Sequence, residues 1–260
     1  MSLWCVSTHR WHTVSLLLLG VVTIGGSVIA ALAGMLCVRR WVPAHILDKH
    51  RDVAGFKYAV VGVIYAVTLA LVVLATWTDF EKAEVFVDQE AVSLRDIFRL
   101  SEALPAAAKR AIQIRVQEYA RAVINDEWDA MDRGRESTRA HALAQEVWNV
   151  ILSLEPQTAR EQVAFAALVT RLNDFRNNRD LRLLASRQAL PGVMWTVLIS
   201  GGLITVVFTY FFRVETLWAQ GLMTALLALT IGLNLFLIAA LDNPFKGRQV
   251  SPRAFETLLD

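Results

Sequence analysis

The sequence predicts an all-α membrane protein, with four transmembrane helices in two hairpins and an extramembrane helical bundle inserted between them. Its 260 residues are 55% apolar and only 19% charged, and the mean hydropathy is +0.42. A soluble domain usually carries about a quarter charged residues. Of the 50 charged residues, 34 lie between positions 79 and 190, whereas four other stretches hold none. The composition therefore argues against a soluble globule.

The four uncharged runs cover residues 13–38, 58–78, 193–212 and 221–241. Each is long enough to cross about 30 Å of hydrocarbon as a helix. Helices are expected because every backbone amide in lipid must be bonded within its own segment. Ala31-Leu32-Ala33 resembles a signal-peptide cleavage site, but the first run is far longer than the roughly 7–15 residues of a signal core. We therefore expect this run to remain a membrane span.

The charge distribution divides the chain into four expected parts. They are a first transmembrane hairpin (1–78), an extramembrane helical domain (79–190), a second transmembrane hairpin (191–242) and a C-terminal tail (243–260).

Apolar residues at helical spacing predict four helices in the extramembrane domain. The first continues from the second span to Leu104-Pro105, and the others cover residues 106–130, 139–154 and 158–190. The first carries an apolar stripe at steps of three and four residues: Phe80, Ala83, Val87, Ala91, Leu94 and Phe98. Thr158 with Glu161 fits a capping box at the start of the last helix.

Motifs for catalysis or metal binding are absent from the sequence. It contains no G-x-S-x-G, Walker-type loop, HExxH or CxxC, so we expect neither an enzyme nor a cofactor. The group His45, Asp48, His50 and Asp52 lacks a standard metal-ligand spacing and is more typical of a solvated loop. The acidic set Asp126, Glu127, Asp129 and Asp132 could bind a divalent cation, but we favour a wet helix face paired with arginines. A net charge of +2 does not favour a nucleic-acid partner.

Small and polar residues inside the spans suggest contacts between helices. Gly26, Ala30 and Gly34, followed by Gly62 and Ala66, allow close helix approach, either within one chain or between subunits. Asn234 is the strongly polar residue near the middle of a span. A polar side chain at this depth either lines a pore or forms a hydrogen bond with another helix. The spans contain no Asp, Glu, Lys or Arg, which weighs against a proton-coupled carrier.

Several strings resemble a bacterial membrane family described as bestrophin-like. The matching strings are DVAGFKYAVVGVIYAV at 52–67, YARAV at 119–123 followed by Glu127-Trp128, LMTAL at 222–226, and DNPFKG at 242–247 followed by VSP at 250–252. The resemblance extends from about residue 39 to the C-terminal end. It implies a distant similarity to bestrophins, which are oligomeric anion channels with two hairpins of spans and a large helical cytosolic region.

The resemblance also suggests pore residues, since the second span of bestrophins lines the pore with aromatic and small side chains. The matching stretch offers Phe56, Gly62, Tyr65 and Thr76, and Asn234 is a further candidate. Asp79, Glu81, Glu84, Asp88 and Glu90 crowd the exit of this span. In a ring of subunits these carboxylates would favour cations, unless the arginines before the third span neutralise them. The sign of the permeant ion is therefore open.

Two functions from different classes remain. The first is a homo-oligomeric ion channel or channel-like protein, with the lipid bilayer and inorganic ions as partners and the second span at its axis. The second is a membrane-anchored interaction or signalling module whose helical domain binds a protein.

Basic residues occur on both sides of the predicted spans, so the positive-inside rule does not decide the orientation in the cell membrane. The short loops carry Arg39, Arg40, Lys49, Arg51, Lys57 and Arg213, which favours a cytoplasmic position for these loops. The domain side carries Arg176, Arg179, Arg182 and Arg187 before the third span and Lys246, Arg248 and Arg253 after the fourth. Together with the bestrophin topology, the second set leads us to expect a cytoplasmic domain and cytoplasmic termini.

Overall fold

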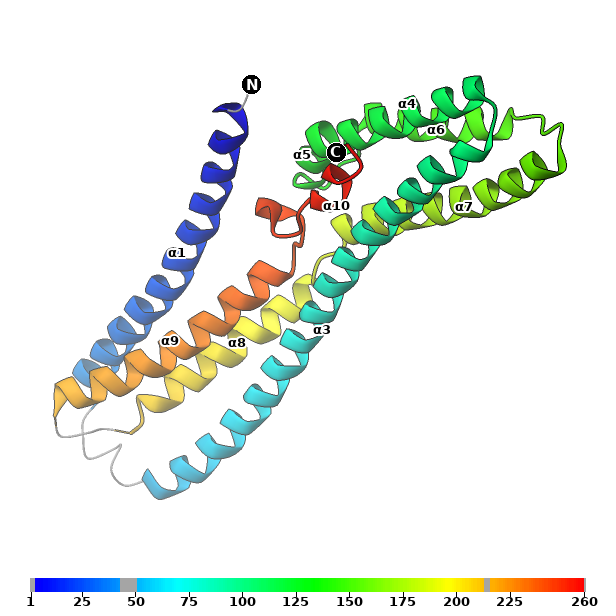
Figure 1. The fold of residues 1–260 in the computed structure, drawn as a ribbon. Helices are drawn as coiled ribbons and strands as arrows, with labels where there is room; N and C mark the ends of the chain where they lie inside the picture. Colours follow the sequence, from blue (N-terminus) through cyan, green and yellow to red (C-terminus); the bar gives the residue numbers. More distant parts are fainter. Residues whose placement is uncertain (1–2, 43–50, 213–215, 260) are drawn as a thin grey trace. The chain divides into compact units, whose positions relative to one another are not determined.

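The computed structural model describes residues 3–42, 51–212 and 216–259. Within these residues the ordered elements are helices, and none is a strand, as the predicted all-α class requires. The chain divides into two compact units, residues 1–78 with 189–242 and residues 79–188 with 243–260. Each unit is described separately, with its elements labelled in Figure 1.

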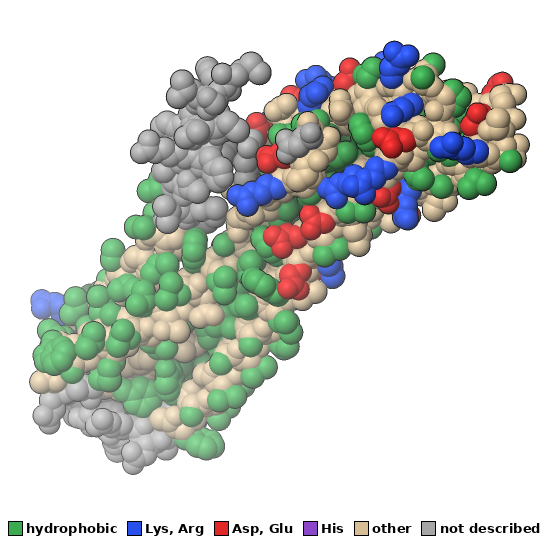
Figure 2. Space-filling model, in the orientation of Figure 1, with side chains coloured by type: hydrophobic (Ala, Val, Ile, Leu, Met, Phe, Trp, Pro, Cys, Tyr) green, Lys and Arg blue, Asp and Glu red, His purple; other side chains and the backbone are tan. Residues whose placement is uncertain are grey.

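The first unit contains the membrane spans. Its helices are α1 (Leu3–Trp41), the first part of α3 (Arg51–Leu100), α8 (Gly192–Thr209) and α9 (Leu217–Leu241). Each is long and apolar enough to cross a membrane, which confirms the four predicted spans. Hydrophobic side chains cover much of the visible face of these helices (Figure 2). On α8 and α9, the exposed hydrophobic residues include Val197, Leu203 and Leu233. Such a surface suits lipid.

Glycines allow close contact at specific places in this unit. A Cβ atom at Gly34 would lie 2.7 Å from the hydroxyl of Tyr210, and one at Gly201 would lie 2.6 Å from the Tyr65 ring. Gly26 and Gly62 face open space, with no atom within 4 Å of such a Cβ. The first span packs mainly against α9. The predicted small-residue contacts therefore occur within the chain at Gly34, but at neither Gly26 nor Gly62.

The second unit is a helical bundle with one hydrophobic core. Its helices are the second part of α3, η1 (Ser101–Ala103), α4 (Ala106–Ala122), η2 (Val123–Glu127), α5 (Trp128–Met131), α6 (Thr138–Leu152) and α7 (Ala159–Arg187). The predicted stripe on α3 enters this core, where Ala83, Val87, Ala91 and Leu94 are at most 1% exposed. The capping box is also present, since Thr158 Oγ1 accepts from Glu161 N at 3.2 Å while Gln157 N donates to Glu161 Oε2 at 2.8 Å.

The helix expected over residues 106–130 is interrupted by a wider turn. The five residues of η2 form a π-helical turn between α4 and α5. A π turn inserts one extra residue and rotates the following side chains relative to a regular helix. Val123 and Glu127, the first and last residues of this turn, are both buried.

Residues 243–260, set apart in the sequence as a tail, belong to the second unit. They contain η3 (Lys246–Arg248) and α10 (Arg253–Glu256). The indole nitrogen of Trp128 donates to the carbonyl of Val250 at 3.1 Å. Phe245 and Phe255 contact the Trp128 ring edge-on, with ring centroids 5.7 and 6.2 Å away. The segment after the fourth span is thus part of the core.

Replacing Gly201 with alanine should destabilise the membrane unit, because the new methyl group would overlap the buried Tyr65 ring. We expect a loss of about 1–3 kcal/mol, measured as a lower midpoint of thermal unfolding in detergent. Gly25→Ala is the matched control, since nothing lies within 4 Å of its Cβ position. Equal behaviour of the two variants would contradict the packing described for Tyr65.

Candidate functional site

The membrane part of α3 has an exposed side and a packed side. On the exposed side, Phe56 is 77% exposed, and Val60, Val63 and Val67 are also exposed. Gly62 is half-buried. Phe56, Val60, Val63 and Val67 form one exposed apolar stripe, and Gly62 lies about a third of a turn around the helix from it, toward the Tyr65 side.

Two other candidate pore residues, Tyr65 and Thr76, lie on the packed side of α3. The Tyr65 hydroxyl donates to the carbonyl of Leu198 at 3.0 Å, and its ring rests on Gly201 and Gly202 of α8. Thr76 is buried, and its hydroxyl bonds back to the carbonyls of Val72 and Val73 at 3.0 Å. Both side chains therefore contribute to helix packing inside the chain.

The remaining membrane candidate, Asn234, bonds to its own helix. Its side-chain nitrogen donates to the carbonyl of Thr230 at 2.9 Å. The sequence offered either a pore contact or an interhelical hydrogen bond for this residue. The observed bond is intrahelical, because the carbonyl four residues earlier is within reach of a short amide side chain.

The acidic candidates follow the membrane part of α3. Asp79 forms an exposed ion pair with Lys82, with 3.1 Å between Oδ1 and Nζ. Glu81 and Glu84 are exposed and form no ion pair with any residue that the structure describes. The negative charge of these two side chains is therefore available to solvent ions.

The arginines before α8, which could have neutralised these carboxylates, have other partners. The Arg176 guanidinium lies 5.3 Å from the centre of the Trp148 ring, and Arg187 Nη2 is 3.5 Å from Glu136 Oε2. Arg179 and Arg182 are buried in ion pairs with glutamates of the second unit. None of these contacts involves Glu81 or Glu84.

A buried charge cluster joins α3, α4, η2 and α7 in the second unit. It consists of Glu90, Tyr119, Glu127, Arg179 and Arg182. Arg182 donates from Nε to Glu90 Oε2 and from Nη2 to Glu127 Oε2, both at 2.6 Å. Arg179 Nη2 donates to Glu127 Oε1 at 2.7 Å, and the Tyr119 hydroxyl donates to Glu90 Oε1 at 2.5 Å. Two cations and two carboxylates thus balance each other away from water.

The electrostatics of the cluster keep both arginines charged. Burial alone would lower the pKa of Arg182, but the carboxylates of Glu90 and Glu127 outweigh burial and raise it above its usual value. Burial raises the pKa of the Tyr119 phenol well above its usual value, and Glu90 and Glu127 add to the effect. The tyrosine therefore remains a neutral hydrogen-bond donor.

The sequence patterns do not predict this cluster. From them we group Glu90 with the carboxylates at the exit of the second span and expect Glu127 on a solvated helix face, and both expectations are wrong. In the structure both side chains are 0% exposed. The missed signal for Glu90 is its spacing, three residues after Val87 and four before Leu94, which places it on the buried stripe of α3.

No metal site appears among the described residues, where no group of three or more His, Cys, Asp or Glu side chains gathers to hold an ion. The acidic set at positions 126–132 does not converge on one point. Asp126 pairs with Arg139 at 3.0 Å, and Asp132 Oδ1 accepts from the backbone of Gly247 at 3.0 Å. The group at residues 45–52 lies outside the residues whose side chains the structure describes.

Comparison with known proteins decides the family. The model of a family described as a bestrophin-like domain matches residues 25–255. The chain belongs to this bestrophin-like family. The match confirms the resemblance found in the sequence and extends it into the first span.

Solved structures of a bacterial bestrophin homologue from Klebsiella pneumoniae share the fold of this bestrophin-like protein. One crystal structure, of a single-residue mutant, has 13% sequence identity and a TM-score of 0.68, and the match covers 93% of this chain and 99% of the homologue. A second mutant structure has 12% identity and a TM-score of 0.69, covering 92% and 96%. No curated protein matches the chain.

Removing one cation from the buried charge cluster of the bestrophin-like protein should be costly. Arg182→Met leaves Glu90 and Glu127 buried without their main partner, and we expect a loss of about 3–5 kcal/mol in the free energy of unfolding. Denaturant unfolding in detergent measures this loss.

Arg171→Met provides the matched control for that measurement. Arg171 also bridges two carboxylates, Asp96 and Asp174, but its side chain is 46% exposed. Its loss should cost about 0–1 kcal/mol. A similar cost for both variants would show that burial does not determine the contribution of the cluster.

Proposed function

We propose that the chain forms a homo-oligomeric ion channel in the cell membrane, with α3 at its axis. Membership of the bestrophin-like family supports a channel-type function, and the resemblance to bestrophins supports the second span as the pore helix. The exposed apolar side of α3 supports the same assignment. A narrow apolar constriction can conduct and gate by wetting and dewetting, so a pore needs no charge inside the span.

Within this proposal, the exposed side of α3 contributes the pore surface. Phe56 lies there as an aromatic residue, and Gly62 lies at the margin of this side as a small residue. Tyr65 lies on the opposite side, where its hydrogen bond to Leu198 of α8 holds the rotation of α3. Thr76 is buried on the packed side, and its hydroxyl bonds to the backbone of α3 itself. Asn234 is a weaker candidate for a pore-lining residue, since its side-chain amide donates a hydrogen bond to the carbonyl of Thr230.

The permeant ion that the charges favour is a cation. Glu81 and Glu84 are the observation on which this assignment depends, because their exposed carboxylates have no described ion-pair partner. Repeated around an oligomer, Asp79, Glu81 and Glu84 would form rings of carboxylates at the pore mouth. Rings of acidic side chains attract cations and repel anions.

Charge reversal at the pore mouth tests this assignment. In liposomes, the wild-type protein should conduct K⁺ or Na⁺ in preference to Cl⁻, and Glu81→Lys with Glu84→Lys should lower the cation-to-anion permeability ratio at least tenfold. Reversal potentials in asymmetric salt measure the ratio.

The matched control for the pore mouth is Glu155→Lys, an exposed glutamate between α6 and α7. It should leave the permeability ratio unchanged. A preserved ratio in the double variant would exclude these carboxylates from the conduction path. Absence of conductance for every ion tested would favour the membrane-anchored interaction module instead.

We further propose that the extramembrane unit and both termini are cytoplasmic. The bestrophin topology supports this orientation, as do the basic residues on both sides of the second hairpin. Reporter fusions provide the test: a reporter after Glu102 should be active on the cytoplasmic side, and one after Arg213 on the opposite side. The reverse pattern would show that the loops rich in Arg and Lys decide the topology.

A further inference from the structure

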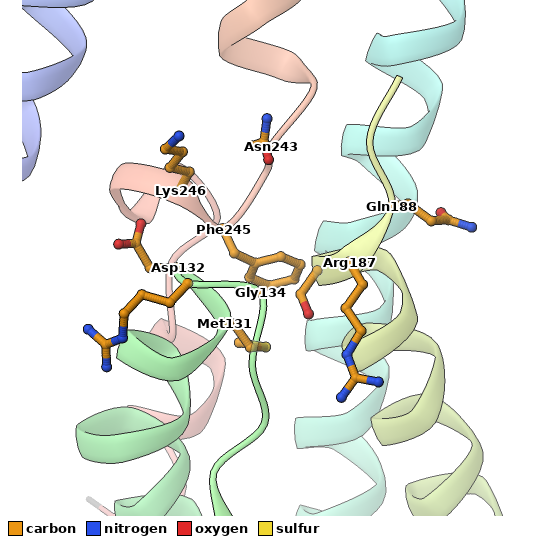
Figure 3. Close-up of a pocket in the computed structure, with 10 residues that line it drawn as sticks. Met131, Asp132, Gly134, Arg187, Gln188, Asn243, Phe245 and Lys246 are labelled. Atoms are coloured by element: carbon orange, nitrogen blue, oxygen red, sulfur yellow. The ribbon is translucent and has the colours of Figure 1, made fainter. Parts of the chain in front are cut away.

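A basic pocket lies in the second unit beside the residues that connect it to the second hairpin. Its cavity measures about 360 Å³ and is lined from the ends of α5 and α7 and from the segment after α9. Arg133, Arg187 and Lys246 contribute three cations, and Asp132 contributes one carboxylate. In the view of Figure 3, Lys246 and Arg187 lie on opposite sides of the Phe245 ring.

The cations of this basic pocket are largely uncompensated. Arg133 and Lys246 are exposed, and neither forms an ion pair within the described part of the chain. Arg187 makes one long contact with Glu136, at 3.5 Å. The single carboxylate, Asp132, accepts a hydrogen bond from the backbone nitrogen of Gly247 at 3.0 Å.

The frame of the pocket is well packed. Phe245 is only 2% exposed and contacts the buried Trp128 ring. Gly134 and Gly247 have φ values of 65° and 70°, which other residues rarely adopt, and they make the two turns that carry Arg133 and Lys246. Arg133 and Lys246 therefore lie on two turns, and the pocket that they line also contains the buried Phe245.

Chain connectivity places these cations close to the ends of two membrane spans. Gln188 of the pocket lies four residues before Gly192, where α8 begins, and Asn243 lies two residues after Leu241, where α9 ends. Four residues reach at most about 14 Å even when fully extended. The polar headgroup layer of a bilayer lies directly outside the hydrocarbon that these spans cross.

We propose that the basic pocket binds the headgroup of an anionic phospholipid. Arg133 and Lys246 would pair with the phosphate, and Arg187, on the other side of the Phe245 ring, would pair with any second negative charge of the headgroup. A lipid is favoured over a free anion because only a few residues join Gln188 and Asn243 of the pocket to two membrane spans, so headgroup phosphates are present at high local concentration within reach of the connecting residues. This site is independent of the ion pathway proposed for α3.

Native mass spectrometry of the purified full-length protein in detergent tests the proposal, with phosphatidylglycerol and phosphatidylcholine of identical acyl chains as probes. The wild type should prefer phosphatidylglycerol. Each cation near an anionic lipid contributes about fivefold in affinity, so Arg133→Gln with Lys246→Gln should weaken phosphatidylglycerol binding about 25-fold. Binding of phosphatidylcholine should not change.

The control is Arg135→Gln with Arg253→Gln, which removes two exposed cations of the same unit that do not line the pocket. It should change phosphatidylglycerol affinity by less than about twofold. Equal losses in both double variants, or no loss in the pocket variant, would overturn the proposal. If the double variant does not fold, Lys246→Gln alone should still weaken binding about fivefold.

Inorganic phosphate distinguishes a lipid from a free anion at the same site. Phosphate equimolar to the lipid should not displace phosphatidylglycerol from the wild type. Displacement would overturn the lipid assignment and identify a site for small anions.

Discussion

The exclusion of charge from the hydrocarbon governs the arrangement of this protein. Because an unpaired ion is costly in lipid, the four spans contain none, and their helices associate through small residues and tyrosine hydroxyls instead. Tyr65 donates to Leu198, and Tyr210 donates to the carbonyl of Ala31 at 2.8 Å. The charges are displaced to the segment after the second span, where α3 leaves the membrane unit. In the channel that we propose, ion selectivity is therefore set at that point.

The same helix handles its carboxylates in two ways. Glu81 and Glu84 are exposed on α3, whereas Glu90, less than two turns beyond Glu84, is buried and paired with Arg182. A buried ion pair is weak support for stability, because desolvation offsets much of the attraction. Its geometric demands are strict, however, since both carboxylates must meet a planar guanidinium. The buried charge cluster therefore fixes the rotation of α3 in the second unit, and with it the direction in which the exposed carboxylates point.

Local sequence patterns predict most of the helices, but they do not predict which residues pair when the partners are far apart in the sequence. The spans, the stripe from Ala83 to Leu94 and the capping box at Thr158 each depend on neighbours within a few residues, so the sequence displays them. Arg182 meets Glu90 across 92 positions and Glu127 across 55, and no local pattern records those partners. The π-helical turn at Val123–Glu127 also has no distinct sequence signal. Among the candidate pore residues, Phe56 is exposed, as a surface position requires. Tyr65 is buried against Gly201, and the sequence alone does not reveal that long-range contact.

Residues after the fourth span contribute to the core of the second unit, and this has a consequence for biosynthesis. When the ribosome has completed the segment from Asp79 to Gln188, the indole of Trp128 still lacks the carbonyl of Val250 and the rings of Phe245 and Phe255. Those groups emerge only after α8 and α9 have been translated. The extramembrane unit therefore cannot complete its core until the last span has been synthesised. Maturation of the bundle is in this way coupled to completed insertion, and a chain that stalls before α9 keeps an open, hydrophobic gap accessible to chaperones and proteases.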